Sequence, residues 1–408
     1  MPRTSTSKPK ASRGGAGRIL TTHVGSLIRP PKLQTFLRAH HEGRRYNKTA
    51  FRKCLHDSVA EVVRRQAETG LDIINDGEFG KTITWSRYVL ERMSGYERRP
   101  VKQDGKMSPA SIGQDRREFS EFYAEYDPTQ NFTNMSGWHV TGPIGYTGHA
   151  ALQRDIENFK EAAKKAKTTD LFMAAVAPAS VAPDRVDEHY KNDEEYVFAV
   201  AEALREEYRA IVDAGLILQV DDAFLALTYE VMVPPKTMKD YRKWAEMRIE
   251  ALNHALDGLP EERTRYHVCW GSWNGPHVYD VEIKHIIDLI LKVRVGGYQL
   301  EMANARHEHE WRVWEDVKLP EGRVLIPGVI AHTTNVVEHP ELVAERLVRL
   351  ANLVGRERVI AGTDCGFAQG PFTQRVHPSI QWAKLQAMVE GARLASKQLW
   401  KRGRGRAA

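Results

Sequence analysis

The residues best suited to chemistry are two of the three cysteines, because each follows a short apolar run. Cys269 lies two residues after His267 in Tyr-His-Val-Cys-Trp, and side chains two apart in a β-strand point to the same face. Cys365 follows a second apolar run at 358–360, and Glu301 ends a third. A lone His-x-Cys pair would be weak evidence, because buried cysteine is a common core residue. Together, His267, Cys269, Glu301 and Cys365 suit tetrahedral zinc and predict a zinc site.

Apolar stretches alternate with helix-like stretches along the chain. The expected strands are 19–26, 71–76, 170–178, 216–222, 266–269, 297–301, 324–330 and 358–364. Eight strands alternating with helices predict a (β/α)8 TIM barrel, an α/β fold whose active site lies at the carboxyl ends of the strands. Polar residues collect at these ends: Ser26, Glu78, Asp221, Cys269, Glu301, His332 and Cys365. The metal ligands are therefore expected at the mouth of the barrel.

Residues of about 91–144 interrupt this alternation between the second and third strands. The segment is polar and includes an aromatic cluster of Phe119, Phe122, Tyr123 and Tyr126. A connection of this length is uncommon unless it is functional. We expect an insertion that covers the active face, and the alternative is a solvated excursion without a role there.

Charge and composition restrict the classes of protein. The 408 residues carry a net charge of +6, but five basic residues lie within 1–18 and six within 391–408, so the remainder carries −5. We predict disordered basic tails at 1–18 and 401–408 around a single zinc-binding barrel at 19–400. Basic tails without a basic folded face argue against nucleic acid as a partner. No run is long enough to span a membrane, and three cysteines without a disulfide framework indicate the cytoplasm.

Seven short motifs resemble the C-terminal catalytic domain of cobalamin-independent methionine synthase, in the same order along nearly the whole of 19–400. They are His23-Val24-Gly25-Ser26, Asp76-Gly77-Glu78-Phe79, Gln219-Val220-Asp221-Asp222, His267-Val268-Cys269, Leu300-Glu301, Pro327-Gly328-Val329 with His332, and Asp364-Cys365-Gly366. The resemblance implies zinc held at the positions of His267, Cys269, Glu301 and Cys365. It also implies that Gly25, Ser26, Glu78 and Asp221 hold the amino-acid part of homocysteine, and that His332 is the proton donor.

The departures from the family pattern concern the methyl donor. The family's Asp-Glu-Pro is here Asp221-Asp222-Ala223, and Leu227 occupies the place of an acidic residue that contacts the pterin. The tryptophan expected after the third strand is missing from 175–183, and the N-terminal barrel of the folate-dependent enzyme is absent from the sequence. We therefore expect methyltetrahydrofolate to be a poor donor. The architecture resembles single-barrel members, which include epoxyalkane:coenzyme M transferase and proteins that take methyl groups from a corrinoid protein.

The expected activity is zinc-dependent transfer of a methyl or alkyl group to a small thiol, of the homocysteine S-methyltransferase type. Zinc bound to a thiol sulfur removes its proton and keeps a nucleophile at neutral pH. Three alternatives stay open: an epoxyalkane:coenzyme M transferase (2-hydroxyalkyl-coenzyme M lyase), a uroporphyrinogen decarboxylase-like enzyme, and a binding protein or corrinoid partner without turnover. The supporting residues also have structural alternatives, since Glu78 could order its loop, Asp221 or Asp222 could cap the following segment, and His332 could be a turn histidine.

The acceptor expectation rests on charge. Carboxylates at Glu78 and Asp221 favour an ammonium group and repel a sulfonate. A sulfonate would need an arginine or lysine, and we expect none at the strand ends; the nearest candidates, Arg29, Arg87 and Arg306, lie in loops. The sequence therefore favours homocysteine over coenzyme M.

The run His307-Glu308-His309-Glu310 offers a second cluster of metal-ligand side chains. It has no soft ligand and lies in a charged segment. We therefore expect it to be solvated and not to form the main metal site.

Overall fold

Eight parallel strands form the central sheet of the computed structural model, which describes residues 17–99, 113–127 and 137–401. Their order is β1-β11-β10-β9-β8-β7-β5-β2. The strands are β1 (Leu20–Thr21), β2 (Ile73–Ile74), β5 (Asp170–Val176), β7 (Ile217–Asp222), β8 (Thr264–Val268), β9 (Gly297–Leu300), β10 (Val324–Ile330) and β11 (Ile360–Thr363). Asp72 N donates to Thr21 O (3.1 Å) and Thr22 Oγ1 to Ile73 O (3.0 Å), which links the two ends of this order. The predicted barrel is confirmed.

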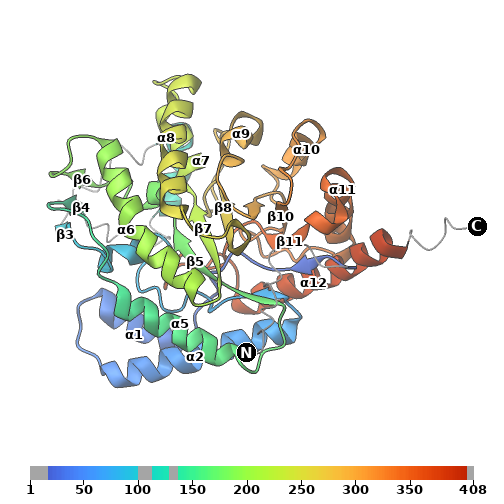
Figure 1. Ribbon diagram of the computed structural model, residues 1–408, viewed down its shortest axis with the longest axis horizontal. Helices are drawn as coiled ribbons and strands as arrows, with labels where there is room; N and C mark the ends of the chain where they lie inside the picture. The colour runs from blue at the N-terminus through green and yellow to red at the C-terminus, as the bar shows by residue number, and fades with distance from the viewer. Residues whose placement is uncertain (1–16, 100–112, 128–136, 402–408) are drawn as a thin grey trace, which may run out of the picture.

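Helices surround the barrel on its outer side (Figure 1). They are α1 (Pro31–His41), α2 (Lys48–Thr69), α5 (His149–Ala163), α6 (Asp193–Asp213), α7 (Phe224–Met232), α8 (Met238–Leu256), α9 (Ile287–Ile290), α10 (Val313–Asp316), α11 (Pro340–Val354) and α12 (Pro378–Lys401). Local signals set several of their ends. The Asn47 side chain caps α2 by accepting from Ala50 N (3.0 Å), and Gly70 ends it with a left-handed φ of 91°.

The interior of the barrel is layered beneath the strand ends. An apolar cluster that includes Leu20, Ile73, Phe172, Ile217, Val324, Ile326 and Ile360 fills its lower part. A polar layer lies against this cluster, where the Arg265 guanidinium covers the Phe172 ring at 3.8 Å. Arg265 donates to Gln219 Oε1 (2.7 Å) and Thr22 Oγ1 (3.1 Å), and Gln219 in turn donates to Asp221 Oδ1 (2.7 Å). The buried floor therefore fixes one of the carboxylates at the mouth.

The expected insertion between the second and third barrel strands contains β3 (Tyr96–Arg99), α3 (Gln114–Glu118), α4 (Ser120–Tyr126) and β4 (Gly137–Val140). β3 and β4 pair with each other, and β4 also pairs with β6 (Val186–Asp187) in the loop after β5, at the left of Figure 1. The Tyr123 hydroxyl accepts from Trp273 Nε1 (3.2 Å), and the Tyr126 hydroxyl from Asn274 N (3.1 Å). Helix α4 therefore covers the loop after β8, on the carboxyl-terminal side of the barrel.

The expected basic tails, and residues 100–112 and 128–136 of the insertion, lie outside the described residues, apart from 17, 18 and 401. Arg18 is described and pairs with Asp72 through its guanidinium (Nη1 to Oδ2, 2.7 Å). Among the helices of the described ranges, none combines the length and apolar character needed to cross a bilayer.

Candidate active site

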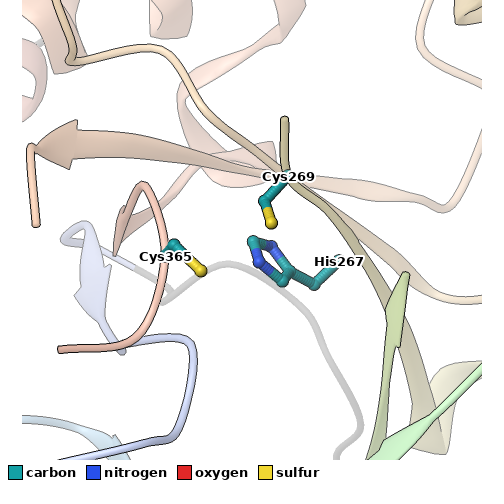
Figure 2. Close-up of side chains that lie close together, drawn as sticks. All are labelled: His267, Cys269 and Cys365. Carbon is teal, nitrogen blue, oxygen red and sulfur yellow. The ribbon is translucent and has the colours of Figure 1, made fainter. Parts of the chain in front are cut away.

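Three of the four predicted metal ligands meet at the carboxyl end of the barrel. The ligand atoms of His267, Cys269 and Cys365 all lie within 4.8 Å of one another. Strand β8 carries His267 and leads directly into Cys269, while Cys365 follows β11. In Figure 2 both sulfur atoms point toward the imidazole ring. All three residues are buried, and neither ring nitrogen of His267 has a hydrogen-bond partner among the described residues.

The fourth predicted ligand, Glu301, lies outside this 4.8 Å group. Its carboxylate is close enough for its charge to raise the pKa of Cys269, and burial raises the pKa of Glu301 itself well above its usual range. Oε2 accepts from Asn304 Nδ2 (3.0 Å), and Oε1 has no hydrogen-bond partner among the described residues. Coordination by Glu301 therefore stays a prediction.

Asp364 holds the loop that follows Glu301 against the strand end that carries Cys365. Its Oδ1 accepts from the backbone nitrogens of Met302 and Ala303, both at 2.9 Å, and its Oδ2 accepts from Asn304 Nδ2 (3.2 Å). This carboxyl is fully buried, and burial raises its pKa to about 6. The sequence marks Asp364 only as part of a motif, because its partners lie in the loop after another strand.

The two thiols shift each other's pKa in opposite directions. The contact with Cys269 holds the pKa of Cys365 well below its usual value, against the effect of burial. The same contact, together with burial, raises the pKa of Cys269. Burial opposes a charge on His267, but the adjacent Cys365 sulfur and Asp221 carboxylate raise its pKa overall.

A cavity of about 400 Å³ opens onto this cluster, within the usual range for small-molecule sites. Ser26, Glu78 and Asp221 line it together with the three clustered residues. Gly25 lies behind this lining with a φ of 144°, where a side chain would be strained and would overlap the Glu78 carboxylate. The structure therefore gathers the predicted acceptor residues around the predicted metal site, and their roles stay predictions.

The expectation that no lysine or arginine lies at the strand ends is wrong. Lys81 Nζ lies 3.0 Å from Glu78 Oε2, and both side chains are buried. Burial also raises the pKa of Asp221 to about 7. Arg375, in the loop after β11, lines the same cavity. Three residues separate Glu78 from the end of β2, so its loop turns back and brings Lys81 to the carboxylate. The acceptor end is thus less negative than two unpaired carboxylates would make it.

The family model for the catalytic domain of cobalamin-independent synthase matches residues 173–393, more than half of the chain. The chain belongs to this family. It is 25% identical over 386 residues to a methionine synthase of Sulfolobus acidocaldarius, which covers 94% of both sequences. It is 27% identical over 375 residues to the 2-hydroxypropyl-CoM lyase of Xanthobacter autotrophicus, which covers 85% of this chain and 86% of the relative.

A solved structure of this synthase family shows the same fold. The B12-independent methionine synthase from Shewanella sp. W3-18-1, in complex with selenomethionine, superimposes with a TM-score of 0.68 at 19% identity. The match covers 94% of this chain and 99% of that one. The predicted family resemblance is confirmed, and the enzyme class that follows is a methionine synthase-like transferase. This assignment favours thiol alkylation over the porphyrin decarboxylase alternative.

In this member of the synthase family, the predicted proton donor His332 is buried just beyond β10. Burial lowers its pKa to about 4, although the Cys365 sulfur acts in the opposite direction. Neither of its ring nitrogens has a hydrogen-bond partner among the described residues, and the ring is absent from the described cavity lining. His332 is therefore neutral at rest near pH 7, and its role as proton donor stays a prediction.

The expectation of a solvated His307-Glu310 segment is wrong for its first and last residues. His307 is 2% exposed and bonds through Nδ1 to Glu310 Oε2 (2.8 Å) and through Nε2 to Asp280 Oδ2 (3.0 Å). Asp280 also accepts from His277 Nδ1 (2.9 Å). Asp280 and His277 come from the loop after β8, so the segment's own charge pattern could not reveal them. The network is structural and lies outside the three-residue cluster.

This network predicts a pH dependence of stability. Burial opposes the charge on His307, but the hydrogen bonds to Asp280 and Glu310 outweigh it and raise the pKa to about 9. Because the folded pKa exceeds the unfolded value of about 6.5, the contribution is fully present below pH 6.5 and is lost as pH rises through 9. It amounts to about 3 kcal/mol. Urea unfolding of wild type and His307→Gln should differ at pH 6 and converge above pH 9.

The exposed neighbour His309 supplies the matched control for this comparison. His309→Gln should follow the wild-type pH profile. A His307→Gln profile parallel to wild type from pH 6 to pH 9.5 would show that His307 is not charged in the folded protein.

Proposed function

We propose that the protein is a zinc-dependent thiol alkyltransferase of the homocysteine S-methyltransferase type. The observation that supports this most is the convergence of His267, Cys269 and Cys365 at the mouth of the barrel. Two thiols and an imidazole without hydrogen-bond partners are the donor set that zinc prefers, and such a buried imidazole is costly without a ligand. Glu301, with its buried unpaired Oε1, is the proposed fourth ligand.

The residues of the chain divide the chemistry between them. Bound zinc keeps the acceptor sulfur deprotonated at neutral pH. The acceptor thiol loses its proton, its sulfur bonds to the donor carbon, and the bond from that carbon to the leaving atom breaks with its electron pair. The leaving atom then takes up a proton. His332 is proposed to carry this proton, since a neutral imidazole near Cys365 can accept and release one.

Homocysteine is the acceptor we propose, with Gly25, Ser26, Glu78 and Asp221 around its amino-acid part. Glu78 and Asp221 line the cavity and supply negative charge for an ammonium group. Coenzyme M is the second candidate, and the buried Lys81 beside Glu78 is the observation that favours it. The likeness to 2-hydroxypropyl-CoM lyase points the same way.

Two further proposals concern the donor and the compartment. Methyltetrahydrofolate is expected to be a poor donor, because Leu227 lines the cavity at the position where the family pattern has an acidic residue that contacts the pterin. A corrinoid protein is an alternative source of the methyl group. The cytoplasm is the proposed compartment, because its reducing conditions keep the cysteines as the free thiols seen here.

A combined metal and product analysis tests the proposed function. Purified protein should contain about one zinc per chain and should form a thioether from homocysteine or coenzyme M. The donors supplied would be methyltetrahydrofolate, a methylated corrinoid protein and an epoxide. Zinc-loaded protein that forms no thioether with any combination would contradict the proposal.

Asp221→Asn should weaken homocysteine binding to the zinc-loaded protein by about 1.5–3 kcal/mol, the range for a hydrogen bond to a charged group. The substitution keeps the shape of the side chain, and its oxygen can still accept from Gln219 Nε2. Calorimetric titration measures the change. Coenzyme M has no ammonium group and serves as the control ligand, so its affinity should not fall. Equal losses for both thiols would show that Asp221 does not select the ammonium.

A further inference from the structure

The cavity beside the thiols is lined largely by apolar and aromatic side chains. Trp85 and Leu227 pack against the small cluster formed by Cys269, Cys365 and Ala223. Phe224 lies beside Trp85 with nearly parallel rings, whose centroids are 6.5 Å apart and whose planes differ by 19°. Trp273 lines the same cavity. We call the three rings of Trp85, Phe224 and Trp273, together with the neighbouring Leu227, the aromatic lining.

Each member of the aromatic lining comes from a segment that also carries a proposed site residue. Trp85 follows the Glu78 loop, Phe224 and Leu227 begin α7 just after Asp221, and Trp273 follows Cys269 by four residues. The barrel therefore brings these rings to the thiols by the same strand ends that bring the ligands. Of these side chains, Trp85 and Leu227 pack directly against the two cysteines.

Trp273 is held in a fixed position before any ligand enters. A side-chain carbon at Gly271 or Gly275 would overlap its ring, so the indole lies directly against both glycines. The His277 ring stacks on the indole, with ring centroids 4.6 Å apart. The Trp273 Nε1 donates to the Tyr123 hydroxyl (3.2 Å). A ring that is already ordered loses little side-chain entropy when a ligand stacks on it.

Charged side chains next to the aromatic lining already have protein partners. Asp222 accepts from Ser180 Oγ (2.7 Å) and Tyr266 Oη (2.8 Å), and Arg87 pairs with Asp184 (2.7 Å). A pterin presents polar edges that need hydrogen-bond partners, and these charged groups would have to give up their present partners to supply them. An uncharged aromatic group has no such requirement and gains from stacking and burial.

We propose that this part of the cavity binds an uncharged aryl group carried by the alkyl donor, stacked on Trp273 and packed against Trp85 and Phe224. The electrophilic carbon next to that group then faces Cys269 and Cys365 past Leu227. The inference rests on the proposed thiol alkylation where it identifies the ligand as the alkyl donor. The binding site itself rests only on the aromatic lining.

Binding of unreactive probes to the zinc-loaded protein tests the proposal. The probes are 1-phenylethanol and 1-cyclohexylethanol, which differ in the aromaticity of one ring, with 5-methyltetrahydrofolate as the pterin. Calorimetry should show the phenyl probe binding about 2- to 12-fold more tightly than the cyclohexyl probe, the range that aromatic pairing adds beyond burial. It should also bind more tightly than the folate.

Two variants connect this preference to Trp273. Trp273→Leu removes the ring, and Gly275→Ala displaces it while retaining it; both should bring the phenyl-to-cyclohexyl ratio close to one. Trp400→Leu, near the end of α12, is the matched control and should keep the wild-type ratio. Phe224→Leu gives a second measurement should a Trp273 variant fold poorly, and it should reduce the ratio as well.

The outcomes separate this inference from the proposed function. Equal binding of the two alcohols by wild type, or an unchanged ratio in Trp273→Leu and Phe224→Leu, would overturn the aryl site. Tighter binding of 5-methyltetrahydrofolate than of the phenyl probe would overturn it as well. A Trp273-dependent preference in a protein that alkylates no thiol would support the site and contradict the proposed function instead.

Discussion

Cys365→Ser and Cys269→Ser should each reduce bound zinc from about one ion per chain to a small fraction of that. Each removes a soft ligand from a buried cluster whose ligand atoms lie within 4.8 Å. A serine hydroxyl stays protonated at neutral pH and is a poor zinc ligand, since the bound form of cysteine is the thiolate. The loss of zinc affinity should exceed 10- to 100-fold, which is the loss typical of removing a group that hydrogen-bonds to a metal ligand. Metal analysis after dialysis against a weak chelator measures the effect.

Cys54 provides the matched control for these two substitutions. It is also a buried free cysteine, but it lies in α2, away from the strand ends. Cys54→Ser should therefore retain zinc. Full zinc occupancy in both Cys269→Ser and Cys365→Ser would remove the basis of the proposed function.

Asp364→Ala should lower the free energy of unfolding by about 2–6 kcal/mol, because it leaves two buried backbone N–H groups without a partner at about 1–3 kcal/mol each. These groups belong to Met302 and Ala303, which directly follow Glu301. The loop should then shift, and zinc affinity should fall if Glu301 is a ligand. Urea unfolding of the zinc-free protein isolates the stability term, and a chelator competition measures the metal term.

Asp364→Asn is the control of equal size. Its amide oxygen can still accept from Met302 and Ala303, so most of the stability should return, with a loss of about 1 kcal/mol for the changed contact to Asn304. If the alanine variant loses no more stability than the asparagine variant, then Asp364 does not hold this loop. If the alanine variant loses stability but keeps full zinc affinity, Glu301 is not a required ligand.

The barrel and the pairing of His267 with Cys269 could be predicted because both depend on short-range patterns. A strand with period two places His267 and Cys269 on one face wherever the strand lies. The end of helix α2 is likewise a local feature, because Gly70 ends it by its own backbone conformation. Parallel strands of a barrel share one carboxyl end, so separate strand tips could be assigned to one mouth without knowing any contact.

The charge states at the site could not be predicted in the same way. Glu78 looked like an unpaired carboxylate in the sequence, and the turn of its own loop brings Lys81 to 3.0 Å. The His307 segment looked solvated, yet Asp280 from the loop after β8 reaches its ring. Both results depend on which groups are buried together, and burial changes the free energy of a charge far more than neighbours in sequence do.

The sequence by itself determined the fold class, the family and the residue types at the strand ends, because periodicity and residue identity are local properties. Only the tertiary structure decided which of those residues meet. It joined Cys365 to His267 and Cys269, left Glu301 just outside them, and set the Trp273 ring against Gly271. The meeting of the strand ends depends on the packing of segments that are distant in sequence, and the position of the Trp273 ring depends on the fold of its own loop, so no short pattern records either.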